Sequence, residues 1–321
     1  MKCKSIVACL LCLILAASAW AVDVETISVT KETEGANLAP IAENLELRTY
    51  RNTTAGGTFQ AVDPDGDLVT FRLCSEPKKG TVIQNGADFQ YTPDARKKGR
   101  DSFTYRAVDT QGNVSAEATV SIRIDRQTGK TCYADMEGNP LAYAALRLAE
   151  EGIFVGEQVG SSRCFSPEQQ VSRGEFLTMC AAMTGMQPLE GVTRTGFSDD
   201  EGIELWLKPY VSAALMCGVV QGSAGDGGRI VFAPDRAITV AEAAVMLNNF
   251  LLITDSVTTM ASENVPVWAA RAVSNLAACN IYSPSFRAEV PLTRGDAAVM
   301  LSAAMDMCEK RGSSIKRIWA D

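Results

Sequence analysis

Apolar and polar residues alternate along the chain between residues 39 and 125. An alternation with a period of two predicts short β-strands that each bury one face. Turn sequences rich in Gly, Asn and Asp separate these runs and supply the reversals of direction that a sheet needs. The pattern predicts a β-sandwich of about 85 to 90 residues, with strands at 58–62, 68–73, 88–92, 101–108 and 116–124.

From residue 132 onward the apolar residues recur at spacings of three and four, and Ala becomes frequent. This spacing places apolar side chains on one face of an α-helix. A pair of helical stretches joined by a loop occurs three times. The first helices are expected at 141–151, 206–217 and 267–279, and the second helices at 173–183, 240–251 and 294–307.

An aromatic residue, a Ser or Thr and an acid recur in one register ahead of each second helix. The Ser or Thr follows the aromatic residue by seven positions, and the acid follows three positions later. A period at this scale indicates repeats that bury a common core together. The three sets are Phe165, Ser172 and Glu175; Phe232, Thr239 and Glu242; and Phe286, Thr293 and Asp296.

Each Ser or Thr and its acid have the spacing of a capping box, which satisfies backbone groups at a helix start. The next residue is Arg173 in the first set and Arg294 in the third, whereas the second set carries Val240. A cation at a helix N-terminus is disfavoured by the helix dipole. We therefore expect Arg173 and Arg294 to meet an anion, since helix N–H groups and guanidinium groups both bind carboxylates and phosphates.

Charge and composition narrow the range of functions. The chain carries 30 Lys and Arg against 38 Asp and Glu, a formal net charge of −8, and it has no His. No nucleic acid partner is expected, because binding to phosphate backbones depends on clustered Lys and Arg. Without His, Ser-His-Asp and Cys-His catalysis and the commonest metal ligand are excluded. The seven Cys that would remain after signal cleavage form no CxxC pair, so no metal knuckle is indicated.

The N-terminus predicts export. Lys2 and Lys4 precede a short apolar run, and Ala19-Trp20-Ala21 forms a small-x-small cleavage pattern. We expect a signal peptide at 1–21, with cleavage after Ala19 as the alternative, and an exposed lead-in at 22–38. No other run approaches the roughly 20 apolar residues of a transmembrane helix, so a soluble exported protein is expected.

A cluster of acids in one turn raises the question of a metal. Asp63, Asp65 and Asp67 could ligate Ca²⁺ through their carboxylates. An Asp- and Gly-rich turn that needs no ion explains the same residues, and we favour it. Asp63 with Asp67, or Asp101 with Asp109, could serve as a catalytic acid pair, but each has a turn or strand-edge explanation. We expect no cofactor and no enzymatic activity.

The sandwich resembles the bacterial immunoglobulin-like or cadherin-like domains of surface proteins. The resemblance covers most of residues 39–125 and implies a spacer or adhesive module rather than chemistry. The segments that carry it are Asp63-Pro64-Asp65-Gly66-Asp67, Phe89-Gln90-Tyr91-Thr92-Pro93, Gly99-Arg100-Asp101-Ser102-Phe103-Thr104-Tyr105 and Val108-Asp109.

The helical part is similar to S-layer homology domains, the triplicated modules with which many bacterial surface proteins attach to the cell wall. Tryptophans open two of the first helices, at Trp206 and Trp268, while Pro140 stands at this position in the first repeat. Gly218 ends one first helix, and Asn280 replaces it in the third repeat. The family's Thr-Arg-Ala-Glu-like tetrad appears as Ser172-Arg173-Gly174-Glu175, Thr239-Val240-Ala241-Glu242 and Thr293-Arg294-Gly295-Asp296.

This resemblance implies that the chain binds an anionic secondary cell-wall polysaccharide, often pyruvylated, in grooves between repeats arranged with pseudo-threefold symmetry. The two arginines would grip its carboxylate, and the tryptophans would either face the sugar or belong to the core. The groove that depends on Val240 would be weakened. The polymer-binding residues so implied are Arg173, Glu175, Trp206, Thr239, Glu242, Trp268, Arg294 and Asp296.

The predicted fold class is a multidomain α+β chain, in which a β-sandwich precedes an all-α pseudo-threefold array. We expect a non-catalytic cell-surface protein that is anchored to the wall polymer. The alternative is an S-layer structural subunit or adhesin, whose sandwich contacts a protein, a glycan or other copies of the chain. The expected linker is 126–131, the repeats are 132–186, 196–252 and 261–308, and the tail is 309–321.

Overall fold

The computed structural model describes residues 37–254, 265–282, 287–312, 314–315 and 318–319. Contacts group Leu38–Asp321 into one compact unit. The expected signal peptide, the lead-in up to residue 36, Phe286 and parts of the third repeat and of the tail lie outside the described residues.

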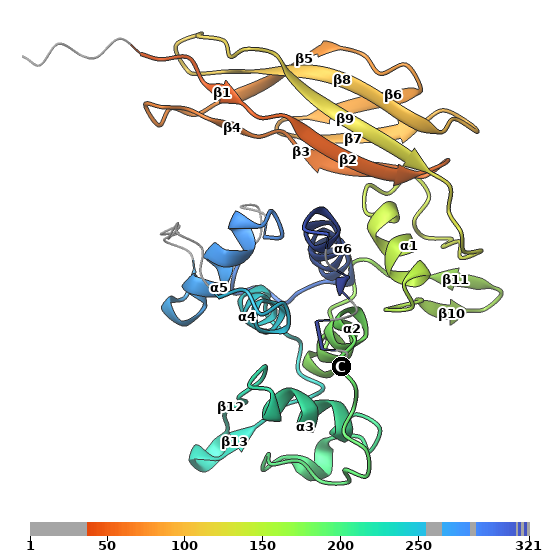
Figure 1. Cartoon of the computed structure of the whole chain (residues 1–321), viewed down its shortest axis with the longest axis vertical. Helices are drawn as coiled ribbons and strands as arrows, with labels where there is room; N and C mark the ends of the chain where they lie inside the picture. The colour runs from red at the N-terminus through yellow and green to blue at the C-terminus, as the bar shows by residue number, and fades with distance from the viewer. Residues whose placement is uncertain (1–36, 255–264, 283–286, 313, 316–317, 320–321) are drawn as a thin grey trace, which may run out of the picture. The chain divides into compact units, whose positions relative to one another are not determined.

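The N-terminal part is a β-sandwich (Figure 1). One sheet has four strands in the order β2-β9-β8-β5, and the other has three in the order β3-β7-β6. β2 and β9 are parallel, and the other pairs are antiparallel. A short ribbon pairs β1 with β4. The strands are β1 Ile41–Ala42, β2 Leu45–Tyr50, β3 Ala55–Thr58, β4 Ala61–Val62, β5 Thr70–Ser75, β6 Gly80–Asn85, β7 Asp88–Pro93, β8 Gly99–Val108 and β9 Ala118–Asp125.

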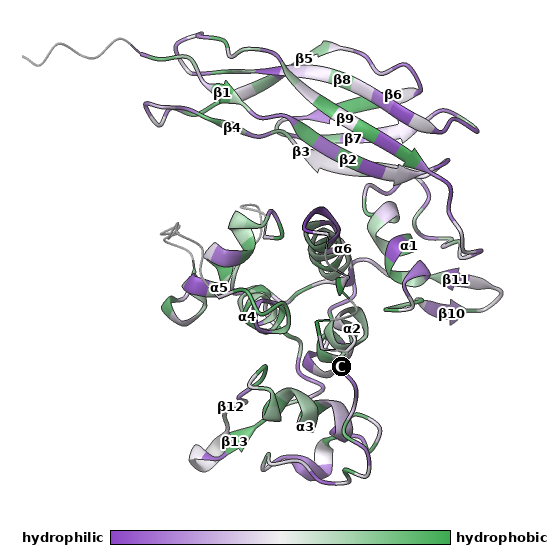
Figure 2. Ribbon diagram, viewed as in Figure 1, coloured by the Kyte–Doolittle hydropathy of each residue, from purple (hydrophilic) through white to green (hydrophobic). Residues whose placement is uncertain are grey.

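Aromatic side chains fill the interior of the sandwich. Along β2 and β9 hydrophobic and hydrophilic residues alternate, so one face of each strand turns inward (Figure 2). The ring of Phe59 lies 4.6 Å from that of Phe89 and 4.3 Å from that of Tyr105, measured between centroids. Tyr91 and Phe103 are fully buried. The predicted β-rich, immunoglobulin-like or cadherin-like domain is confirmed.

Two details of the strand prediction are wrong. The strand expected at 58–62 is broken, because β3 ends at Thr58 and β4 begins at Ala61. Between them the carbonyl of Gln60 accepts a hydrogen bond of 2.9 Å from the hydroxyl of Tyr105. The prediction also omits β2 and β6. β6 begins and ends within turn sequences, so its own short alternation is hidden between them.

The described C-terminal part contains six α-helices at the predicted places. Short antiparallel ribbons also occur between the paired helices of the first and second repeats, so the all-α expectation is wrong. These loops are long enough to fold back on themselves as hairpins. The helices are α1 Ala142–Glu150, α2 Arg173–Thr184, α3 Lys208–Met216, α4 Val240–Phe250, α5 Val267–Ala278 and α6 Arg294–Lys310, and the ribbons are β10 Glu157–Val159 with β11 Ser162–Cys164 and β12 Ser223–Ala224 with β13 Ile230–Val231.

Three backbone hydrogen bonds close a ring among the three repeats. Val171 N donates to Leu292 O at 2.9 Å, Leu292 N donates to Ile238 O at 2.8 Å, and Ile238 N donates to Val171 O at 3.0 Å. Each residue precedes the cap of a second helix, and all three are fully buried. Each repeat therefore gives one hydrogen bond to a neighbouring repeat and receives one from the other. This arrangement places the starts of α2, α4 and α6 around a common centre.

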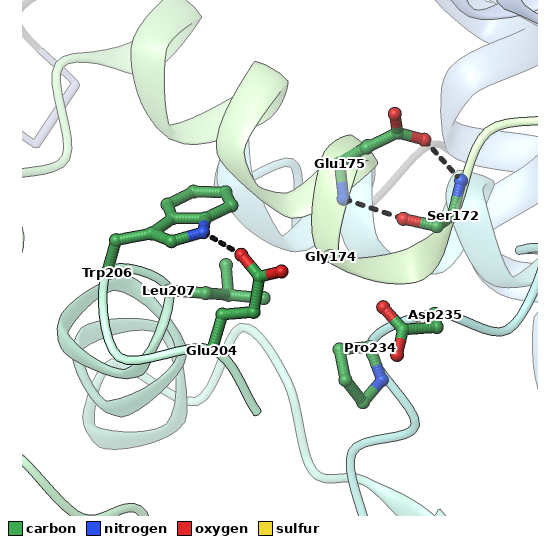
Figure 3. Close-up of a pocket in the computed structure, with 8 residues that line it drawn as sticks. All are labelled: Ser172, Gly174, Glu175, Glu204, Trp206, Leu207, Pro234 and Asp235. Carbon is green, nitrogen blue, oxygen red and sulfur yellow. Dashed lines mark hydrogen bonds between the residues drawn. The ribbon is translucent and has the colours of Figure 1, made fainter. Parts of the chain in front are cut away.

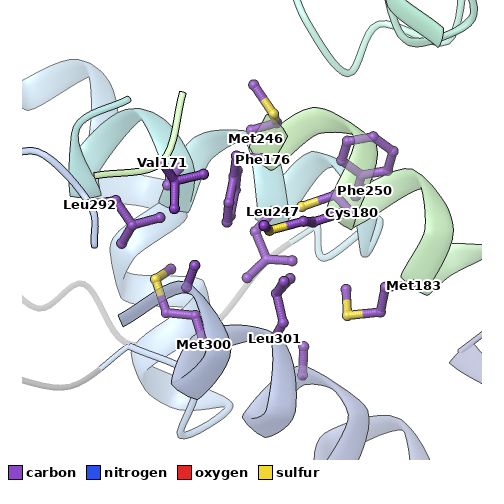
Figure 4. Packing of buried hydrophobic residues seen from close by; sticks show 14 of the residues in the cluster. Val171, Phe176, Cys180, Met183, Met246, Leu247, Phe250, Leu292, Met300 and Leu301 are labelled. Atoms are coloured by element: carbon purple, nitrogen blue, oxygen red, sulfur yellow. The ribbon is translucent and has the colours of Figure 1, made fainter. Parts of the chain in front are cut away.

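The second helices bury one another below this ring (Figure 4). Phe176 and Cys180 on α2, Leu247 on α4 and Met300 and Leu301 on α6 have no exposed surface. These side chains belong to one continuous hydrophobic cluster. The repeats therefore share a core, which explains why their sequence patterns keep one register.

The sandwich contacts the helical part through apolar, charged and backbone groups. The rings of Tyr50 on β2 and Tyr143 on α1 lie 5.0 Å apart, measured between centroids. Arg48 on β2 and Arg147 on α1 both bind Asp306 on α6, at 3.2 and 2.6 Å. On β3, Gly56 N donates to Pro140 O at 3.0 Å. Pro140 stands where the other repeats carry an exposed Trp, so this departure from the repeat pattern coincides with the junction to the sandwich.

Candidate functional site

The first two tetrads form the capping boxes that their spacing predicts. Glu175 N donates to Ser172 Oγ at 3.2 Å, and Ser172 N donates to Glu175 Oε2 at 2.8 Å. Thr239 and Glu242 exchange the same two bonds at 3.3 and 3.1 Å. Such a cap stabilises a helix by about 0.5 to 2 kcal/mol.

The third tetrad is capped in a different way. Asp296 N donates to Thr293 Oγ1 at 3.1 Å, while the Thr293 hydroxyl donates to Asp296 Oδ2 at 2.8 Å. The side chain of Asp is one methylene shorter than that of Glu. Its carboxylate therefore meets the hydroxyl of the cap rather than the backbone N–H.

The remaining amides at the helix starts are also engaged. Arg173 N and Gly174 N donate to carbonyls of the second repeat, both at 2.9 Å. Arg294 N and Gly295 N donate in the same way to the first repeat, at 2.8 and 2.9 Å. The corresponding bonds of α4 go to the third repeat. The expectation that these helix starts offer free N–H groups to an anion is therefore wrong. The acceptors are Arg236 O and Pro234 O for α2, Val290 O and Ala288 O for α4, and Gln169 O and Pro167 O for α6.

Arg294 lies inside the protein. Its side chain is 2% exposed, it donates to Glu157, and it lies 3.8 Å from Glu175 of the first tetrad. Its guanidinium carbon lies 5.0 Å from the centroid of the Phe154 ring. The anion that Arg294 meets thus comes from the neighbouring repeat of the same chain.

Arg173, in the first repeat, has a similar environment and lies against the second repeat. Its side chain is 9% exposed and lies 3.8 Å from Glu242 of the second tetrad. Its guanidinium carbon lies 5.4 Å from the centroid of the Phe232 ring. Burial lowers the pKa of Arg173, and the attraction of Glu242 offsets part of this decrease. The expectation that these two guanidinium groups face a ligand is corrected: they join adjacent repeats through internal ion pairs.

Glu242 has a second cationic partner. Arg236 binds both of its carboxylate oxygens, at 2.6 and 3.0 Å. Burial alone would raise the pKa of Glu242, but the hydrogen bonds from Arg236 and from Thr239 N lower it. Val240, at the Arg position of this repeat, is 1% exposed and belongs to the core. The polymer-binding role of Glu242, Thr239 and Asp296 remains a prediction.

Both predicted tryptophans are exposed. Trp206 precedes α3 and is 56% exposed, and Trp268 is the second residue of α5 and is 60% exposed. Of the two alternatives, core residue or ligand platform, the core alternative is therefore wrong for both. A large exposed aromatic face at a repeated position is typical of a binding surface.

A cavity of about 280 Å³ lies beside Trp206, between the first and second repeats (Figure 3). Trp206 and Glu204 line it from the segment before α3, and Glu175 lines it from the start of α2, with its carboxylate turned toward Ser172 N. The indole N–H of Trp206 donates to Glu204. The lining residues include three acids and no Lys or Arg; they are Ser172, Gly174, Glu175, Glu204, Trp206, Leu207, Pro234 and Asp235.

Two acids of this cavity, Glu204 and Asp235, were not predicted from the sequence. A signal for Asp235 was present, because an acid follows the recurring aromatic residue by three positions in every repeat. The other two acids in this register are Glu168 and Glu289. Glu204 has no such recurrence, and only the folded chain brings it to the cavity.

The acid-rich turn of the sandwich is stabilised by its own side chain. Asp63 Oδ1 accepts hydrogen bonds from Asp65 N at 3.0 Å and from Asp67 N at 3.1 Å. Among the described residues no group of three or more His, Cys, Asp or Glu is placed to hold a metal ion. Asp63 Oδ2 and Asp67 Oδ2 are nevertheless buried without a hydrogen-bond partner in this part of the chain. The Ca²⁺ hypothesis therefore remains a prediction.

The other proposed acid pair has structural partners. Asp101 accepts hydrogen bonds from Lys78 N, Lys79 N and the hydroxyl of Tyr91, at 2.8 to 2.9 Å. Asp109 accepts from Asn113 N at 2.8 Å. Both carboxylates thus hold strands and turns in place, as the strand-edge explanation predicts.

Comparisons with known proteins identify only the N-terminal part. Residues 37–126 match the family model of the bacterial cadherin-like domain. A search of curated proteins gives no match. No described helix is long and apolar enough to cross a membrane.

Several solved structures are similar to a part of this chain. The SrpA adhesin from Streptococcus sanguinis is 19% identical over 31% of this chain and 63% of its own, with a TM-score of 0.24. The endo-fucoidan hydrolase MfFcnA4 from glycoside hydrolase family 107 is 25% identical over 29% of this chain and 14% of its own, with a TM-score of 0.24. Drosophila N-cadherin is 11% identical over 28% of this chain and 35% of its own, with a TM-score of 0.23. The chain thus spans less than two thirds of each of these proteins.

Proposed function

We propose that the chain is a non-catalytic, exported protein of the bacterial cell surface that attaches to a wall polysaccharide through its helical repeats. Three S-layer homology-like tetrads in one register support this proposal. The closed ring of backbone hydrogen bonds among the repeats is what a pseudo-threefold array of such modules requires. The bacterial cadherin-like domain at residues 37–126 is consistent with a place at the cell surface.

The observation that carries the proposal is the exposed face of Trp206 beside a cavity between two repeats. The exposed face of Trp206 is apolar, and a sugar ring offers an apolar face of similar shape to cover it. Polar groups on the opposite wall of the cavity, such as Ser172 and Asp235, can then orient the sugar hydroxyls.

This mechanism differs from the one that the tetrads suggest. Arg173 and Arg294 maintain the spacing between repeats, so the polysaccharide is held by the Trp face and by carboxylate and hydroxyl groups. Trp268 occupies the same register at the start of the third repeat. It provides a second exposed aromatic face of the same kind.

Cosedimentation of the purified chain with wall sacculi tests this proposal, before and after the polymer that is not peptidoglycan is stripped. We expect binding to intact sacculi and loss of binding to stripped sacculi. Trp206→Ala should weaken binding roughly thirtyfold, because a central aromatic contact contributes about 2 kcal/mol.

Met216→Ala is the matched control. Met216 lies on α3 of the same repeat, is 77% exposed and is absent from the cavity lining. Equal affinities for the wild type, Trp206→Ala and Met216→Ala would show that the cavity does not bind the wall. Equal binding to stripped and intact sacculi would show that the polysaccharide is not the ligand.

An adhesin or S-layer structural subunit is the second candidate, and the cadherin-like domain favours it. In that case the sandwich binds a partner or another copy of the chain. Light scattering over a range of protein concentrations separates the two functions. A subunit of a surface layer forms oligomers or lattices as concentration rises, whereas an anchored monomer does not.

A further inference from the structure

The charge of the cavity beside Trp206 indicates which kind of sugar it accepts. We infer that this cavity selects an amine-bearing sugar of the polysaccharide over an anionic one. The inference rests on the proposed function, because it concerns the ligand of the same cavity. It reverses the sign of the ligand charge that the tetrad arginines suggest.

The first step concerns the negative groups. Glu175, Glu204 and Asp235 line the cavity from three different segments of the chain. Glu175 is the least available of the three, because one oxygen accepts Ser172 N and the other lies 3.8 Å from Arg294. Glu204 accepts the indole N–H of Trp206. Asp235 is exposed and has no hydrogen-bond or ion-pair partner among the described residues. Carboxylate oxygens thus remain free to accept hydrogen bonds from a ligand.

The second step concerns the positive groups. No Lys or Arg lines the cavity. Arg173, on the first repeat, is turned toward Glu242 and is 9% exposed. Lys208, next to Leu207 in sequence, is bound to Asp200 at 2.8 Å. Arg294 lies 3.8 Å from Glu175, but its side chain is 2% exposed and it also binds Glu157. An anionic sugar would therefore meet Glu204 and Asp235 without an exposed Lys or Arg in the cavity lining, in a chain whose formal net charge is −8.

The third step concerns Trp206. An aromatic face attracts an ammonium group through its quadrupole, and neighbouring carboxylates add charge-assisted hydrogen bonds. A volume of about 280 Å³ is at the small end of ligand cavities, so it suits a single sugar ring with the polymer continuing into solvent. A sugar that carries a free amine meets both the aromatic face and the carboxylates.

Calorimetric titration of the whole chain with three tetrasaccharides tests the inference. The probes are a glucosamine tetramer, its fully N-acetylated form and a galacturonic acid tetramer. We expect the amine form to bind about tenfold more tightly than the N-acetylated form, because the exposed carboxylates of Glu204 and Asp235 together contribute about that factor. The acidic form should bind more weakly than either.

A pair of double variants shows where the selectivity arises. Glu204→Gln with Asp235→Asn keeps the shape of the cavity and removes two charges. It should lower affinity for the amine form about tenfold more than affinity for the N-acetylated form. Glu137→Gln with Glu190→Gln removes the same charge from exposed positions outside the cavity lining and should change neither.

Three results would overturn the inference: the acidic tetramer binding as tightly as the amine form, equal effects of the two double variants, or no binding of the amine form. The proposed function is judged separately by sacculi. Binding to intact sacculi that requires Trp206 would stand even if the preferred sugar proved anionic.

Discussion

The contact between Gly295 and Leu141 gives the sharpest test of how the repeats pack. Gly295 is the second residue of α6, and a Cβ added there would lie 2.6 Å from Leu141 Cδ1 of the first repeat. It would also lie 3.3 Å from Pro167 O. Gly174 has the same relation to Leu207, at 2.8 Å. The glycine of the tetrad is thus paired with a large side chain of a neighbouring repeat.

The second repeat shows how the clash can be relieved. Its tetrad has Ala241 at this position, and the third repeat has Ala269 where the others have Leu141 and Leu207. Ala241 N still donates to a neighbouring carbonyl, at 2.7 Å. A Cβ is therefore compatible with the backbone contact. The leucine side chain is what excludes it from the other two repeats.

We predict that the effect of Gly295→Ala changes sign with the residue at position 141. With Leu141 present, overpacking costs about 1 to 3 kcal/mol and outweighs the 0.5 to 1 kcal/mol that Ala gains over Gly in a helix. With Leu141→Ala already made, the same substitution should stabilise the protein by about 0.5 to 1 kcal/mol. The gain in helix propensity is common to both backgrounds, so the two substitutions are coupled by the overpacking cost of about 1 to 3 kcal/mol.

Urea unfolding of the wild type, the two single variants and the double variant measures this coupling. Leu141→Ala alone should destabilise, since it removes a partly buried apolar side chain. Gly174→Ala with Leu207→Ala provides an independent repetition of the cycle. Additive free energies of unfolding in both cycles would refute the argument, because they would show that the leucines do not contact the added methyl group.

Three further predictions concern single groups. Arg294→Met should lower the free energy of unfolding by about 1 to 3 kcal/mol, because it leaves Glu175 without its ion pair, and should not change sacculi affinity; unchanged stability with lost binding would contradict the internal role. Burial raises the pKa of the Tyr133 hydroxyl to about 12, whereas this pKa is roughly 10 in the unfolded chain. The contribution of the neutral hydroxyl to the free energy of unfolding is therefore complete below pH 10 and is lost as the pH rises toward 12. Tyr133→Phe should lessen this alkaline loss in thermal unfolding, and an unchanged alkaline limb would contradict the prediction. Excess Ca²⁺ should leave the unfolding temperature unchanged, since Asp63 already caps its turn; a rise that Asp67→Asn abolishes would instead establish a Ca²⁺ site.

The elements themselves could be predicted from the sequence. Helix positions followed from apolar spacing, and the starts of α2, α4 and α6 followed from the Ser or Thr of each tetrad. These signals are local, because a helix start satisfies its amides with residues only three positions away. The β-strands were harder to predict, since β6 derives its identity from pairing with β7 rather than from its own six residues.

The partners of the charged residues could not be predicted in the same way. The argument that an arginine at a helix start needs an anion was sound, but the sequence does not say whether that anion belongs to a ligand or to the chain. Arg294 and Glu175 are 119 positions apart and lie 3.8 Å apart because the three repeats close into a ring.

The sequence alone determined the number of repeats, their register and the helix caps, because these depend on residues close together in the chain. Only the tertiary structure decided which groups face a ligand. It buried both tetrad arginines, left Trp206 and Trp268 in solvent, and gathered Glu204 and Asp235 at one cavity. The exposure and the charge of a site between repeats depend on which distant segments pack against each other. A local sequence pattern does not specify that packing.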